Sequence, residues 1–304
     1  MKILLTGGTG FFGSHLLKSL VDNGHKVVLI KREKSDLWRI KDSLSKIEFF
    51  NIDQGSIAEL NNLHNDVDVC IHAATVYGRN EENVKDIIEA NLFLPLKVLL
   101  FAVNIKCSHF INTDSFFSLT NNNFGYLKDY IQSKKQFKEW GEKIAIQNKI
   151  QFTNMRLFHL YGPMDNIEKF TNSVIDKLLE NETIDLTQGT QLRDFIFTED
   201  AVRAFINVIE NKPEDEVSNF DVGTGKNVMI RDFVEEAHNL IGSKSRLNFG
   251  VIPMHENEPN FPAAHIEELL KIGWSPRISL CEGLTKIVNS KRSLDLIRSV
   301  YSEN

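Results

Sequence analysis

Short apolar runs and longer amphipathic segments alternate along the first half of the chain. The apolar runs are rich in β-branched and aromatic residues and span residues 2–6, 25–30, 47–52, 68–74, 109–113 and 151–158. Segments 11–24 and 56–64 lie between such runs, and their apolar residues have the spacing of a helix that buries one face. This alternation predicts an α/β fold, a doubly wound parallel sheet of the Rossmann type with helices on both sides.

A long helical pattern covers residues 83–105 and contains Pro95. Proline lacks the N–H group that a helix needs, and its ring clashes with the carbonyl group four residues earlier. We therefore expect a kink near Phe93 or Leu94 rather than a straight helix.

The alternation becomes looser after Pro163. Short runs at 184–187 and 218–222 are mixed with helical patterns at 170–179, 199–210, 230–241 and 279–288, which predicts a smaller mixed C-terminal lobe. We assign residues 1–160 to a dinucleotide-binding domain and residues 161–304 to a substrate-binding lobe, with some segments returning to the first domain. The site is expected in the cleft between them.

Composition narrows the possible partners. The 304 residues are 42% hydrophobic, enough to bury a core, and the formal net charge of -6 gives no basic field for nucleic acid or a lipid surface. Cys70, Cys107 and Cys281 have no zinc or redox spacing, so we expect no metal and a reducing compartment. The N-terminal apolar run is too short for a signal peptide, and none elsewhere reaches the length of a membrane span. A cytoplasmic protein is therefore expected.

Three glycines, Gly7, Gly10 and Gly13, follow the first apolar run and open the first helical pattern. Glycines at this spacing permit a tight turn and let the backbone approach a pyrophosphate at the helix N-terminus. Phe11 and Phe12 are expected near the same pyrophosphate through their backbone. The motif predicts a dinucleotide cofactor.

The end of the second run indicates which dinucleotide is bound. Lys31 and Arg32 stand where an acidic residue would hold the ribose 2′-hydroxyl of NAD. Two cations attract the 2′-phosphate of NADP, so NADP(H) is preferred over NAD(H). The alternative is that both side chains only solvate the strand end.

Candidate reacting groups follow the fifth run. Thr113 lies at its carboxyl end, and Tyr130 and Lys134 stand four residues apart in a helical pattern, on one face. An ammonium near a phenol favours the phenolate, which would move the pKa of Tyr130 down from about 10 toward working pH. Such a tyrosine can protonate a carbonyl oxygen while hydride reaches the carbon, and the Thr113 hydroxyl can orient that oxygen.

Together these motifs resemble the extended short-chain dehydrogenase/reductases of the NAD-dependent epimerase/dehydratase family. The resemblance runs from Met1 to about Val288 and includes the strings TGGTGFFG, NIDQGS, VCIHAAT, NMRLFHLYGP, LRDFIFTEDAVRA and IGWSPRISLCEGL. It implies cofactor contacts by Asp53, Ala73, Ala74, Thr75 and Asn91. It also implies that Arg193 reaches the diphosphate of a nucleotide sugar.

Departures from the family pattern refine the prediction. Relatives that dehydrate hexoses have Asp-Glu after the threonine, whereas here Asp114 is followed by Ser115, so dehydration is not expected. Asp114 either orients substrate or caps the next turn. His159 replaces the family's usual asparagine, and Arg79 is either a substrate contact or a solvated loop arginine. The strings HAATVYGR, NTDSFF and YIQSKKQFKEW are similar to those of reductases that make 3,6-dideoxyhexoses on CDP, of the abequose and paratose synthase type.

Three functional hypotheses follow. The first is NADPH-dependent reduction of the C4 ketone of a CDP-linked deoxyhexose, with the proton from Tyr130 and the substrate held by Arg79, Asp114, Ser115, His159 and Arg193. The second is a nucleotide-sugar C4 epimerase that retains NAD. The third is a non-catalytic NADP(H)-binding regulator, which the intact tyrosine and lysine disfavour. The resemblance also suggests a homodimer.

Overall fold

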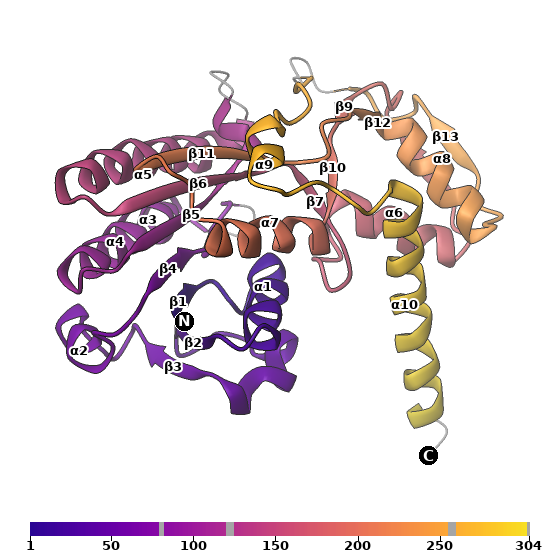
Figure 1. Ribbon diagram of the computed structural model, residues 1–304. Helices are drawn as coiled ribbons and strands as arrows, with labels where there is room; N and C mark the ends of the chain where they lie inside the picture. The colour runs from indigo at the N-terminus through magenta and orange to yellow at the C-terminus, as the bar shows by residue number, and fades with distance from the viewer. Residues whose placement is uncertain (79–81, 120–124, 255–259, 303–304) are drawn as a thin grey trace. The chain divides into compact units, whose positions relative to one another are not determined.

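A seven-stranded parallel sheet is the largest element of the computed structural model, which describes residues 1–78, 82–119, 125–254 and 260–302. Its strands follow the order β11-β6-β5-β4-β1-β2-β3, and every neighbouring pair is parallel. The strands are β1 (Lys2–Thr6), β2 (Lys26–Lys31), β3 (Glu48–Asn51), β4 (Val69–His72), β5 (His109–Ser115), β6 (Gln151–Leu157) and β11 (Val217–Val222). The predicted doubly wound parallel sheet is confirmed (Figure 1).

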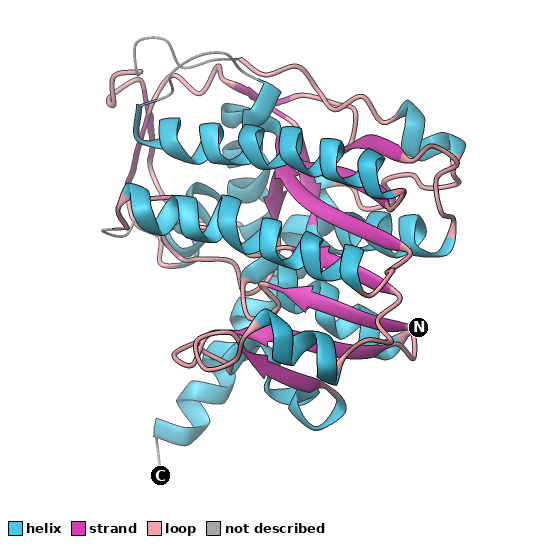
Figure 2. Cartoon of the chain, turned by 90° about the vertical axis from the view of Figure 1, so that its left-hand side faces the viewer, coloured by secondary structure: helices cyan, strands magenta, loops and turns pink. Residues whose placement is uncertain are grey.

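Helices cover both faces of this sheet, so its central strands are buried, whereas the edge strand β3 is partly exposed. The helices α2 (Ile57–Leu63), α4 (Leu94–Asn104) and α5 (Lys128–Asn148) lie on the face turned to the viewer in Figure 2. On the other face, Phe12 of α1 (Phe11–Asp22) packs against Phe205 of α7 (Thr198–Glu210), with 4.9 Å between the ring centroids. Phe110 and Phe152 stack at the centre of the first face. Because both faces are covered, the strand sequences are continuous apolar runs and do not alternate between apolar and polar residues.

The helical pattern at 83–105 is interrupted close to the expected place. It forms α3 (Val84–Ile88), a π-helical turn (Glu89–Phe93) and α4, with Pro95 in the first turn of α4. Proline has no N–H to donate to the helix, and the π-helical turn confines the resulting break in the hydrogen-bond pattern to one turn.

The chain forms two compact units. The first contains Met1–Leu157, Val202–Val222 and Glu267–Trp274, and therefore includes β11 and the short helix α9 (Glu267–Lys271). The second contains Phe158–Ala201, Gly223–Ile266 and Ser275–Asn304. The boundary thus falls inside α7. The domain limits 1–160 and 161–304 stay a prediction, as does a site in a cleft between the domains.

The second unit is built from short strand pairs and three longer helices. β7 (His159–Tyr161) pairs with β10 (Phe195–Phe197), β9 (Leu192–Arg193) with β12 (Val228–Met229), and β8 (Ile184–Leu186) with β13 (Leu247–Phe249). Its helices are α6 (Phe170–Leu179), α8 (Ile230–Ile241) and α10 (Leu280–Ser302). Phe195 and Phe233 stack in its core, with 4.6 Å between their ring centroids.

Short helical turns complete the described chain. They are η1 (Trp38–Lys46), η3 (Phe116–Leu119) and η4 (Gly125–Leu127), all in the first unit. None of the described helices is long and apolar enough to cross a membrane.

Candidate active site

The turn after β1 has the geometry of a phosphate-binding loop. Gly7 has φ +73°, and a Cβ on it would overlap the backbone of Ala73 and Ala74. A Cβ on Gly13 would overlap the Gly7 carbonyl oxygen, which accepts a hydrogen bond from the Gly10 N–H at 3.0 Å. Among the described residues no side chain caps the first turn of α1. This turn therefore fits a pyrophosphate, whose oxygens can accept N–H bonds at the helix N-terminus.

The end of β2 places the two predicted cations in a loop that also carries carboxylates. Lys31 is half-buried and Arg32 is exposed, and the Lys31 ammonium donates to the Arg32 carbonyl at 3.3 Å. Asp53 accepts the Glu33 N–H at 2.8 Å, and so it fixes the loop that carries the cations. Glu33 in turn accepts a hydrogen bond from the Gln54 amide. The loop that carries the two cations therefore also carries the carboxylate of Glu33 and contacts that of Asp53, and the preference for NADP(H) stays a prediction.

The loop after β4 is anchored to β1 by a buried hydroxyl. The Thr6 Oγ1 lies 2.8 Å from the His72 Nδ1 and accepts the Ala74 N–H at 3.3 Å. The Thr6 carbonyl accepts the Ala73 N–H at 3.2 Å. Burial lowers the pKa of His72 well below its ordinary value, so its ring is neutral at neutral pH. His72 therefore orients the loop that presents Ala73, Ala74 and Thr75.

Asn91 ties this loop to the tyrosine helix. It is fully buried in the π-helical turn, and its amide exchanges hydrogen bonds with the Val76 N–H (2.9 Å) and the Val76 carbonyl (2.8 Å). The same amide accepts from the Thr75 hydroxyl and donates to the Ser133 hydroxyl, which donates to the Tyr130 carbonyl. Because the amide makes four such bonds, Asn91 acts here as a positioning residue.

The end of β5 carries one unsatisfied hydroxyl. The Thr113 Oγ1 is buried and has no hydrogen-bond partner among the described residues. Unpaired buried hydroxyls are uncommon, because each costs stability, and a role in catalysis or ligand binding is one explanation for such a group. The Thr113 carbonyl, by contrast, accepts from the Lys134 ammonium at 2.9 Å.

Asp114 is held in a network of its own. Its carboxylate accepts from the Ser115 N–H (2.7 Å), the Ser118 hydroxyl (2.9 Å) and the Asn154 amide (3.0 Å). It is 2% exposed. Of the two roles considered for Asp114, this network favours capping of the turn after β5 over direct contact with substrate.

Tyr130 and Lys134 are both buried on the face of α5 that packs against the end of β5. Their exposed fractions are 2% and 3%. Burial raises the pKa of Tyr130 well above its ordinary value, with further contributions from Tyr77 and Asp114, and only a hydrogen bond from Ser115 opposes this. Burial also lowers the pKa of Lys134 to about 8, which Asp114 partly offsets. The expected lowering of the Tyr130 pKa by Lys134 is therefore absent, because burial dominates and the ammonium donates to Thr113.

Two predicted substrate residues lie in the second unit. His159 begins β7, where its ring packs edge-on against Phe195. Arg193 is 7% exposed, donates to the Leu192 carbonyl at 2.8 Å and lies 5.7 Å from the Phe261 ring centroid. Arg79 lies outside the described residues.

Sequence reasoning missed Asp194, Ser133 and Tyr77. Asp194 accepts from the Thr224 N–H and hydroxyl, the Gly225 N–H and the Ala264 N–H, and so it organises the loops beside Arg193. Asp194 stands inside the quoted string LRDFIFTEDAVRA, which was the available signal. Its role becomes evident only from contacts between residues distant in sequence.

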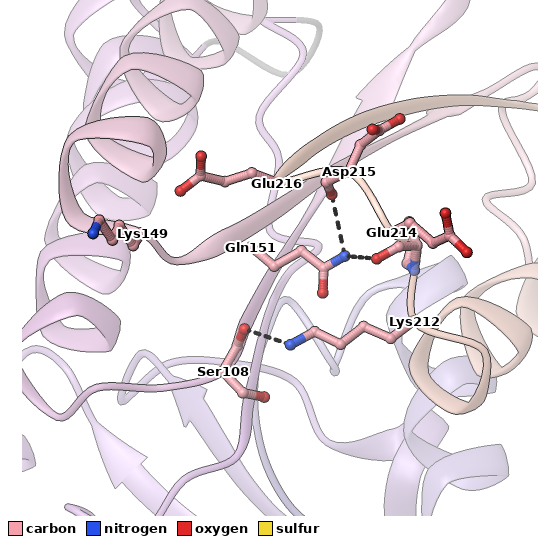
Figure 3. A pocket seen from close by; sticks show the side chains of 8 residues that line it. Ser108, Lys149, Gln151, Lys212, Glu214, Asp215 and Glu216 are labelled. Atoms are coloured by element: carbon pink, nitrogen blue, oxygen red, sulfur yellow. Dashed lines mark hydrogen bonds between the residues drawn. The ribbon is translucent and has the colours of Figure 1, made fainter.

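A hollow of about 330 Å³ lies elsewhere on the first unit (Figure 3). It is lined by Ser108, Lys149, Gln151 and the segment 212–216, at the amino ends of β5, β6 and β11. Ligands of such sheets bind at the carboxyl ends of the strands, where Thr113 lies, so this hollow is not the active site. Among the described residues no three His, Cys, Asp or Glu side chains gather into a group that could hold a metal ion.

The parallel sheet, the glycine turn and the Thr113, Tyr130 and Lys134 group define a Rossmann-fold enzyme of the short-chain dehydrogenase/reductase type. The chain belongs to the NAD dependent epimerase/dehydratase family, whose model matches residues 3–223. The predicted family membership and the prediction of an enzyme are confirmed.

Curated relatives and solved structures are similar over nearly the whole chain. The CDP-abequose synthase of Salmonella typhimurium is 34% identical over 291 residues, 94% of this chain and 97% of that protein. The CDP-abequose synthase of Salmonella muenchen is 33% identical over 95% of this chain and 98% of that protein. These two relatives confirm the resemblance to the abequose synthase type.

The UDP-glucose 4-epimerase of Thermotoga maritima, solved with UDP-glucose, superimposes with a TM-score of 0.83 at 20% sequence identity. The superposition covers 97% of this chain and 99% of the epimerase chain. A UDP-glucuronic acid 4-epimerase mutant of Bacillus cereus, solved with a UDP-sugar and NAD, has a TM-score of 0.84 at 23% identity and covers 97% and 100%. At these identities the likeness shows the fold.

Proposed function

We propose that this protein catalyses the NADPH-dependent reduction of the C4 ketone of a nucleotide-activated deoxyhexose, with CDP as the nucleotide. The observation that carries the proposal is the Thr113 hydroxyl at the end of β5, which is buried and has no partner among the described residues. The carbonyl group of the same residue accepts a hydrogen bond from Lys134. A ketone oxygen can accept the hydrogen bond that this hydroxyl lacks among the described residues. The similarity to two CDP-abequose synthases supports CDP as the nucleotide.

Tyr130 is suited to donate the proton. Its raised pKa keeps the phenol protonated at neutral pH, and an alkoxide that forms at C4 is a much stronger base than a phenolate. A bound nicotinamide dinucleotide supplies the hydride. Lys134 is charged below about pH 8, and by binding the Thr113 carbonyl it holds the end of β5 at the tyrosine.

Ser115 favours reduction over water elimination. It occupies the position after Asp114 where dehydrating relatives carry a glutamate, and its hydroxyl hydrogen-bonds the Tyr130 phenol. A serine hydroxyl does not titrate near neutral pH, so it cannot supply the carboxylate that elimination uses. The site therefore has a proton donor for the C4 oxygen, and position 115 offers no carboxylate for water elimination.

The cofactor and the sugar nucleotide are assigned to residues of different segments of the chain. Lys31 and Arg32 would bind the 2′-phosphate of NADP(H), with Asp53 holding their loop in place. Arg193 would neutralise the diphosphate of the sugar nucleotide, since a guanidinium matches phosphate oxygens in charge and geometry. A homodimer through α4 and α5 is part of the proposal, because these packed helices expose Leu100, Trp140 and Ile146.

The test is a panel of CDP-, dTDP- and GDP-linked 4-keto sugars with NADPH, followed by product stereochemistry. We expect turnover with the CDP sugars and a loss of at least about a hundredfold in Tyr130→Phe with NADPH binding retained. Lys128→Ala, an exposed change in the same helix, is the matched control and should leave turnover unchanged. No reduction of any sugar would refute the proposal, and NAD(H) released on denaturation would instead favour the epimerase.

A further inference from the structure

A second tyrosine packs against the proposed proton donor. The Tyr77 and Tyr130 rings lie 4.8 Å apart between centroids at an angle of 30°, and the interaction with Tyr77 helps to raise the pKa of the Tyr130 phenol. Tyr77 and Phe117 are the partly buried members of a small apolar cluster formed by Leu127, Tyr130 and Ile131. Tyr77 therefore packs on the Tyr130 ring and influences its phenol.

The position of Tyr77 is fixed by its neighbour in sequence. Val76 is bonded through both its N–H and its carbonyl to the Asn91 amide, and Asn91 reaches the Tyr130 carbonyl through Ser133. One side chain thus holds the backbone at both tyrosines. The contact between the rings is consequently part of the built site.

Proton supply is a problem for a buried acid. Tyr130 is 2% exposed and Lys134 is 3% exposed, with the ammonium of Lys134 donating to Thr113 rather than to the phenol. Tyr77, which packs on the Tyr130 ring, is only partly buried and so is more accessible to solvent than Tyr130. After Tyr130 has given up its proton, its phenolate can take a proton from the hydroxyl of the neighbouring tyrosine.

We propose that Tyr77 is a relay residue that holds the Tyr130 hydroxyl and returns a proton to it after each turnover. The proposal rests on the proposed function, in which the Tyr130 O–H bond breaks as an O–H bond forms at C4. The Tyr77 O–H bond then breaks as the Tyr130 O–H bond re-forms. The Tyr77 phenolate takes a proton from water, so each turnover consumes one solvent proton. Tyr77 is a positioning residue, since it acts through Tyr130.

The substitution Tyr77→Phe separates the relay from packing, because it keeps the ring and removes the hydroxyl. Tyr130 still carries its own proton, so the first turnover in a stopped-flow measurement of NADPH oxidation should stay within about twofold of the wild type. Steady-state turnover should fall about tenfold or more, because each later cycle waits for reprotonation. The variant should therefore show a burst of one equivalent that the wild type lacks.

A structural role for Tyr77 would give different results. Equal losses in the first turnover and in the steady state, or an unchanged steady state, would overturn the relay. Phe117→Leu is the matched control, because it removes a ring from the same cluster without a hydroxyl. It should lower stability and leave the ratio of the first turnover to the steady state as in the wild type.

A titration keeps the test independent of substrate. The groups that influence the Tyr130 phenol are Tyr77, Ser115 and Asp114, and Tyr77 raises its pKa. Ring-labelled tyrosine followed by carbon NMR, with the Tyr130 resonance assigned by its loss in Tyr130→Phe, should show a lower pKa in Tyr77→Phe. An unchanged pKa would refute the contact between the hydroxyls. If the wild type reduces no sugar of the panel, the proposed function fails and this titration alone decides the contact.

Discussion

Removing the Thr113 hydroxyl should change stability and activity in opposite directions. Thr113→Val keeps the branched shape that suits a strand and deletes only an oxygen that is buried and unpartnered among the described residues. An unsatisfied buried polar group costs about 1–3 kcal/mol, so the free energy of unfolding should stay equal or rise by about 1–2 kcal/mol. Urea unfolding followed by fluorescence measures this change.

The same substitution should slow catalysis. A hydrogen bond from the hydroxyl to a developing oxyanion is worth about 1.5–3 kcal/mol, which corresponds to a loss of about tenfold to a hundredfold in kcat. Thr153→Val in the neighbouring strand is the matched control, because the Thr153 hydroxyl lies 2.8 Å from the His109 Nε2. It should lower stability by about 1–3 kcal/mol and leave kcat unchanged. A Thr113→Val variant that loses stability while keeping full kcat would refute this reasoning.

Three further outcomes are expected. Asn91→Leu should lower the free energy of unfolding by about 1–3 kcal/mol in urea titrations, because two part-buried hydrogen bonds to the Val76 backbone are lost; a loss below about 0.5 kcal/mol would contradict the clamp. Alanine at both Lys31 and Arg32 should weaken NADPH binding and leave NADH binding unchanged in fluorescence titrations, and equal losses for both would contradict the assignment. Lys134→Met should be more stable than the wild type at pH 7, and its advantage should shrink from about pH 8 to 10.5. Over that interval the unfolded lysine stays charged while the folded one, with a pKa of about 8, is neutral. An advantage independent of pH would contradict burial of the charged lysine.

Local pattern was sufficient for most of the sheet. The six apolar runs of the first half became β1 to β6, because a strand buried on both faces must be apolar along its whole length. The run at 218–222 was predicted as a strand and forms β11, but only its pairing with β6 assigns it to the large sheet. Periodicity reveals that a strand exists, whereas its neighbour depends on contacts across many residues.

The site divides in the same way. Spacing alone predicted Gly7, Gly13, Tyr130 and Lys134 as site residues, because the tight turn and the i, i+4 face are local geometry. The predicted direction of the Tyr130 pKa shift was wrong, because the phenol is buried and the ammonium of Lys134 donates to the Thr113 carbonyl. Burial and partner choice are properties of the packed unit and leave no mark in the spacing of residues.

The sequence by itself determined the class of fold, the family and the helix that carries the Tyr130 and Lys134 pair. The tertiary structure alone decided that the Thr113 hydroxyl has no partner within the described part of the chain, that Asn91 clamps the loop and that Tyr77 lies on Tyr130. Periodic patterns and glycine spacings act over a few residues and can be read from the chain. A hydrogen-bond partner is chosen by residues that folding brings together from distant positions, so it is fixed only when the core is packed.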